Sequence, residues 1–239
     1  MADIIKYQTS LFGNFHDFTL SSEPMQDLFK IFLKDNLIPS TVQEFNVITQ
    51  TVINRPSFIS QNNQYSVTFA SERIDVVCNT KENEISLDAF FSKNYLYTSK
   101  LIEILNSRIN RLSYIEERTY IFEKDNGILL SLIDNNALYN KDKIFEWVIN
   151  NVSHDNWILY ATKQPEKVNI GTTVSNRLIN TIDELKKANS ISLLLDINTV
   201  AENNVPRFNF RDIESYFKKS QVTRNDIVKQ VERIYLNGH

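Results

Sequence analysis

The stretch SLDAFFSKNYLYTSKLIEILNSRINRL, residues 86–112, carries the clearest helix signal of this chain. Ser86 is a typical N-cap residue, and Asp88 places a negative charge in the first turn, where it complements the helix dipole. No Pro or Gly interrupts the stretch. The spacing therefore predicts one long helix over residues 86–112 that organises the core. Its apolar seam recurs at steps of four and three and consists of Phe91, Tyr95, Thr98, Ile102, Leu105, Ile109 and Leu112.

Further helices are predicted near both ends of the chain. Residues 22–36 combine Pro24 in a first turn with an apolar stripe, and Asn36 ends the pattern. From Asp212 onward the chain is helical by periodicity. Thr223 and Asp226 have the form of a capping box, which predicts two helices with a break near Gln221.

Strand patterns fill the regions between these helices. They are rich in Val, Ile, Thr and aromatic residues and cover residues 45–53, 65–70, 74–78 and 114–123. The sequence therefore predicts an α+β protein in which antiparallel sheets are covered by long amphipathic helices. Strands precede a long helix twice, in residues 45–112 and 114–236, so two similar strand-meander-plus-helix halves are one reading of the pattern.

The domain organisation follows from the same pattern. No Pro-, Gly- or Ser-rich linker separates the two halves. We expect an N-terminal α+β subdomain, residues 1–113, packed tightly against a C-terminal one, residues 114–239. A single domain is the alternative.

Composition argues against several classes of function. A net charge of −3 gives no overall attraction for nucleic acid. Cys78 is the only cysteine, so an intramolecular disulfide and a multi-cysteine zinc site are both excluded. Phosphate-binding loops need closely spaced glycines, and the four glycines lie far apart, at Gly13, Gly127, Gly171 and Gly238. We expect no cofactor and no bound metal.

Targeting signals are missing from the pattern as well. Residues 1–15 do not have the charged and apolar regions of a signal peptide, and no apolar run reaches the length of a membrane span. The expectation is a cytoplasmic protein that does not enter the membrane.

The predicted strand at residues 114–122 has two different faces. Its first face carries Tyr114, Glu116, Arg118 and Tyr120, and its second face carries Glu117 among aliphatic residues. If the second face lies under the long helix, the first face presents a carboxylate and a guanidinium among aromatic rings, which would suit recognition. The alternative is an ordinary ion pair on a solvated sheet face.

Histidines and carboxylates provide the candidates for acid–base or metal chemistry. Adjacent residues of a strand point to opposite faces, so a His-Asp pair within a regular strand cannot bind one metal ion. The segment at residues 154–156 has the composition of a hairpin loop. The candidate residues are His16, Asp17, His154, Asp155, Glu116 and Glu117.

The long helix has a second apolar flank in addition to its main seam, wider than a surface helix requires. Either another part of this chain covers that flank or a partner does. The candidate interaction residues are Phe90, Leu96, Tyr97, Leu101 and Ile104.

We therefore expect a non-enzymatic protein-interaction or accessory protein, which binds a protein partner or associates with itself as a homo-oligomer. One alternative is a metal- or carboxylate-dependent hydrolase or nuclease that uses His16 or His154. The other is a nucleic-acid-associated protein that contacts phosphates through Lys218, Lys219 and Arg224.

Overall fold

The computed structural model of the chain describes residues 4–47, 49–81, 84–105, 109–122, 147–160, 163–180 and 187–236. The strands within these ranges are β1 (Ile4–Gly13), β2 (Leu37–Asn46), β3 (Thr51–Ser60), β4 (Tyr65–Phe69), β5 (Arg73–Thr80), β6 (Ile109–Phe122), β7 (Trp147–Ile158), β8 (Pro165–Asn180) and β9 (Lys187–Thr199). The helices are α1 (Glu23–Lys34), α2 (Leu87–Leu105) and α4 (Phe210–Tyr235).

All nine strands belong to one antiparallel sheet with the order β2-β3-β4-β5-β1-β6-β9-β8-β7. The two meanders, β2 to β5 and β7 to β9, lie on either side of the central pair formed by β1 and β6. That pair runs in register from Ile4 opposite Thr119 to Phe12 opposite Arg111, and the register shifts at Gly13. Strands far apart in sequence therefore form the middle of the sheet.

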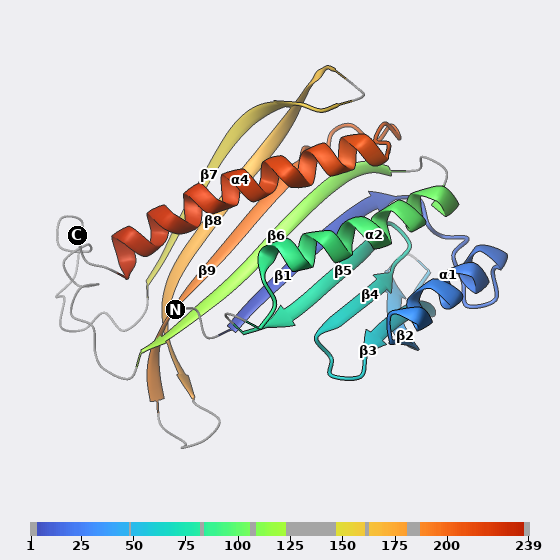
Figure 1. Cartoon of the computed structure of the whole chain (residues 1–239), viewed down its shortest axis with the longest axis horizontal. Coiled ribbons are helices and arrows are strands. Elements are labelled where there is room, and N and C mark those ends of the chain that lie inside the picture. Colours follow the sequence, from blue (N-terminus) through green and yellow to red (C-terminus); the bar gives the residue numbers. More distant parts are fainter. Residues whose placement is uncertain are drawn as a thin grey trace.

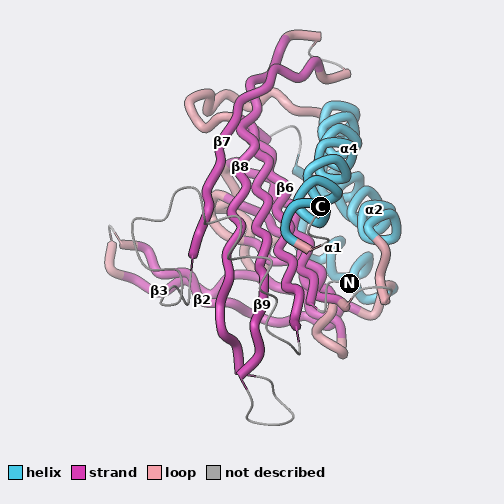
Figure 2. The backbone as a smooth tube through the Cα atoms, turned by 90° about the vertical axis from the view of Figure 1, so that its left-hand side faces the viewer, coloured by secondary structure: helices cyan, strands magenta, loops and turns pink. Residues whose placement is uncertain are grey.

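The described helices pack on one face of this sheet only. Figure 1 shows α1, α2 and α4 in front of the strands, and the side view of Figure 2 places all three on the same side. In that side view β2 and β3 extend toward the opposite side. We call the face without described helices the open face.

The core lies between the helices and the covered face. Aromatic rings connect the layers: Phe32 of α1 contacts Tyr97 of α2 with ring centroids 5.2 Å apart. Phe91 of α2 lies 6.1 Å from Phe217 of α4. These contacts join the helices to one another as well as to the sheet, so the covered face forms one continuous hydrophobic core.

The expected fold class is wrong. The molecule is dominated by a single nine-stranded sheet, and the strands of both expected halves join that one sheet instead of forming separate sheets. The described helices lie on one face of this dominant sheet, so antiparallel sheets covered by long amphipathic helices, in two similar halves, do not describe this protein. The period of a helix is visible within a short stretch of sequence. Which strands pair with one another depends on residues far apart in the chain, and no short stretch shows it.

Two helix boundaries also differ from expectation. α2 ends at Leu105 and β6 begins at Ile109, so Ile109 and Leu112 belong to a strand and not to the helix seam. Ile109 and Leu112 are three residues apart, which fits a helix face. Over so few residues the same spacing also occurs in a strand, so it could not distinguish the two. α4 continues without the break expected near Gln221. The first helix, with Pro24 in its first turn, is confirmed as α1.

The expected boundary between residues 113 and 114 falls inside β6. Within the described ranges, no helix has both the length and the apolar character that crossing a bilayer requires.

Candidate functional site

The two faces of β6 are reversed relative to the recognition hypothesis. Glu116 lies opposite Tyr7 of β1 and Leu195 of β9, both of which are buried under the helices. The face with Tyr114, Glu116, Arg118 and Tyr120 therefore points into the core, and all four side chains are buried.

Glu116 is the centre of a buried ionic cluster. Arg224, on the inner side of α4, donates from Nε to Glu116 Oε2 at 2.7 Å and from Nη2 to Oε1 at 2.8 Å. Arg118 donates from Nε to Oε1, and the Tyr114 hydroxyl donates to Oε2 at 2.5 Å. The carboxylate thus joins α4 to the centre of the sheet through a bidentate pair.

Electrostatics keep this carboxylate ionised. Burial alone would raise the pKa of the Glu116 carboxyl. The hydrogen bond from Arg224 and the positive charges of Arg118 and Arg224 outweigh burial, so the pKa lies below its ordinary value. The Glu116 carboxylate has no exposed surface and two guanidinium partners. Such a group stabilises the fold and is not accessible to a substrate as a general base.

Glu117 lies on the open face. Its Oε1 accepts a hydrogen bond from the Lys6 ammonium at 2.8 Å, and both side chains are partly exposed. The alternative interpretation, an ordinary ion pair on a solvated sheet face, was made for Glu116 and Arg118, whose face is buried; the solvated cross-strand pair is instead the one between Glu117 and Lys6.

The two His-Asp pairs do not converge. His16 follows β1, whereas His154 lies in β7, and β6, β9 and β8 separate those two strands. The expected hairpin loop at His154 is instead part of β7. His154 Nδ1 contacts Asn169 Oδ1 at 2.7 Å, while Asp155 accepts from the Trp157 indole at 2.8 Å. Asp17 is exposed beside His16.

The flank of α2 is mostly covered by this chain. Phe90, Tyr97 and Leu101 are fully buried, and Ile104 packs against the core. Leu96 remains 48% exposed. The basic residues of α4 are also partly engaged, because Arg224 is paired with Glu116 and Lys218 contacts Glu214 at 2.7 Å.

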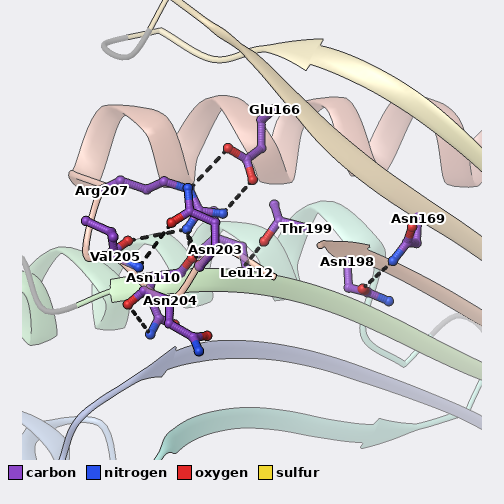
Figure 3. Close-up of polar contacts among 10 residues, drawn as sticks. All are labelled: Asn110, Leu112, Glu166, Asn169, Asn198, Thr199, Asn203, Asn204, Val205 and Arg207. Atoms are coloured by element: carbon purple, nitrogen blue, oxygen red, sulfur yellow. Dashed lines mark hydrogen bonds and ion pairs between the residues drawn. The ribbon is translucent and has the colours of Figure 1, made fainter. Parts of the chain in front are cut away.

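A hydrogen-bonded row of polar side chains crosses the open face, and sequence reasoning missed it. Asp196 of β9 accepts from the Ser113 hydroxyl at 3.3 Å and from the Asn198 amide at 3.1 Å. Asn169 of β8 donates to Asn198 at 3.3 Å, a contact visible in Figure 3, and leads on to His154. The row joins β6 to β7 with Asp196 as its one acidic residue, and its residues come from four separate strands, so no local motif could reveal it.

The row ends at β7, one of the two outer strands of the described sheet. Nine of its twelve side chains are exposed. The apolar ones on the open face are Val148 at 53%, Val152 at 72% and Ile158 at 61% exposure. None of them was singled out from the sequence, because the exposure of a strand residue depends on which strands flank it.

Within the described ranges, no group of three or more His, Cys, Asp or Glu side chains is placed to hold a metal ion. Comparisons with known proteins do not supply a relative: no family model, no curated protein and no solved structure matches this chain.

Proposed function

We propose that this protein is a non-enzymatic interaction protein that associates with a second copy of itself by antiparallel pairing of β7 with β7. The observation that carries the proposal is that β7, the last described strand on this side of the sheet, is long and exposed and has Asp155 as its one acidic residue. The assembly would continue the nine-stranded sheet across a two-fold axis.

An edge strand presents unpaired backbone donors and acceptors, and proteins usually protect it with Lys, Pro, a bulge or short length. β7 has the sequence WVINNVSHDNWI, which contains no Lys, Arg, Glu or Pro. Its pairing with β8 is regular over all twelve residues, from Trp147 to Ile158. At about 3.4 Å per residue the edge is roughly 40 Å long.

The opposite edge of the sheet is protected. β2 contains Pro39, which has no backbone donor, and Glu44, whose carboxylate is paired with Arg55 at 2.7 Å. The difference between the two edges supports β7 as the one that pairs.

The side chains of β7 suggest the register. A two-fold axis at Val152 places this most exposed valine of the strand opposite its own copy. The same register places Val148 opposite Asn156 and Asn150 opposite His154. No like charges then face each other, so the pairing carries no electrostatic penalty.

Disulfide trapping tests the register directly. Cys78 is the only cysteine and is buried, so an added cysteine is the one that reacts. Directly opposed residues of antiparallel strands have the Cα separation that a disulfide requires. Val152→Cys is expected to form a covalent dimer under mild oxidation, seen on a non-reducing gel. Val148→Cys, also at an exposed valine, is expected to run as an uncrosslinked chain on that gel because Asn156 faces it in the dimer.

Native mass spectrometry measures the uncrosslinked assembly. Val152→Lys brings two ammonium groups together at the axis and is expected to give monomers, whereas Val222→Lys, an exposed valine of α4, leaves the dimer intact. A monomeric wild-type chain at high micromolar concentration, or equal crosslinking of both cysteine variants, would contradict the proposal.

A further inference from the structure

A pocket of about 310 Å³ lies at the end of β1 and β6, away from the β7 edge. Four segments build it: the end of β1 with the loop after it, the turn before β5, the start of β6 and the loop after β9. The residues that carry polar side chains into its lining are Asn14, His16, Glu72, Asn110, Arg111 and Asn204. Its volume lies at the lower end of the range for small-molecule sites.

Arg111 is the main donor of this pocket, and its guanidinium is poorly satisfied. Its Nε is buried without a hydrogen-bond partner, and its Nη2 donates only to the neutral amide oxygen of Asn198 at 3.3 Å. Nothing in the described ranges forms an ion pair with it. The guanidinium stacks over the Phe12 ring at 4.6 Å, which holds its plane in place. Its Nη1 has no hydrogen bond to any described residue and is the donor that a bound oxygen atom can take.

Glu72 and His16 also line the pocket, and neither side chain has a hydrogen bond or ion pair to any described residue. The backbone of Glu72 is held against the end of β1, because its carbonyl accepts a hydrogen bond from the Gly13 amide at 3.1 Å. Among the described residues, the pocket therefore presents one cation and one carboxylate that have no ionic partner. A doubly charged anion fits this lining poorly, because the Glu72 carboxylate would repel it.

The wall formed by the loop after β9 is fixed. Arg207 donates to the backbone carbonyls of Asn203, at 2.7 Å, and of Asn110, and its other nitrogens form a bidentate pair with Glu166 (Figure 3). The Asn110 amide donates to the Asn204 carbonyl at 3.2 Å. The pocket is thus held in shape before any ligand binds.

We infer that this pocket binds a small zwitterion of the amino-acid class, with its carboxylate on the Arg111 guanidinium and its ammonium group on Glu72. The two Nη groups of Arg111 offer a pair of parallel donors that suits a carboxylate. The asparagine amides supply neutral donors and acceptors for the remainder of the ligand. This site does not depend on the β7 dimer.

Titration calorimetry with the common free amino acids tests the inference, with acetate, ethylamine and inorganic phosphate as probes that carry a single kind of charge. At least one amino acid is expected to bind more tightly than all three probes. Tighter binding of phosphate, or no heat with any amino acid at millimolar concentration, would overturn the inference.

Three variants connect the binding to the pocket. Arg111→Gln is expected to weaken the bound amino acid by at least about tenfold. Glu72→Gln is expected to weaken that amino acid but not acetate. Arg73→Gln is the matched control, because Arg73 also lies near Phe12 but is paired with Asp75 at 2.9 Å and does not line the pocket. Equal loss in Arg73→Gln and Arg111→Gln would exclude the proposed contact.

Discussion

At the scale of single residues, Glu116 and Glu117 are neighbours with opposite environments. Glu116→Gln removes the negative charge between Arg118 and Arg224 and leaves two buried guanidiniums without a counter-ion. Loss of one partner of a buried pair costs about 3–5 kcal/mol. We expect a decrease of that order in the free energy of unfolding, measured by urea denaturation at neutral pH.

Glu117→Gln is the control for that substitution. It removes only the partly exposed contact with Lys6, and we expect a change of about 0.5 kcal/mol or less. Because the folded-state pKa of Glu116 is lowered, its contribution is present above the unfolded-state pKa and is lost as pH falls through the folded-state value. Similar losses in the two variants at neutral pH would show that Glu116 is not the buried residue.

At the scale of elements, the start of α4 is set by a capping box. The Asn209 side chain accepts from the Asp212 amide at 3.1 Å, and the Asp212 carboxylate accepts from the Asn209 amide at 3.3 Å. We expect Asn209→Ala to lower the free energy of unfolding by about 1 kcal/mol, measured by chemical denaturation.

Thr223→Ala tests whether residues 210–235 form one continuous helix or two helices with a break near Gln221. In the structure Thr223 lies in the interior of α4, where alanine has the higher helix propensity, so stability should stay the same or rise by about 0.5 kcal/mol. If Thr223 capped a second helix, its replacement would instead cost as much as that of Asn209.

At the scale of the whole molecule, one sheet spans the chain. β1 of the first half pairs with β6 of the second half at the centre of the sheet. Above this pair, α2 of the first half packs against α4 of the second. We expect calorimetry of the Val152→Lys monomer to show a single unfolding transition, with equal calorimetric and van't Hoff enthalpies. Two transitions would instead indicate that residues 1–113 and 114–239 unfold as separate units.

Local features of this chain could be predicted from its sequence. Pro24 and the apolar stripe after it identified α1, and the alternation at residues 114–122 correctly separated Glu116 from Glu117. Helix periodicity and strand alternation depend on neighbours within a few residues, so they are legible in the order of the amino acids.

Tertiary structure decided which face of β6 is buried, because that depends on β1, β9 and an arginine 108 positions later in the chain. The same is true of the β7 edge and of the pocket at Arg111, whose lining comes from four separate segments. Strand order is set by hydrogen bonds between distant parts of the backbone, and these depend little on the identity of the side chains. Exposure and charge pairing follow only once that order is known.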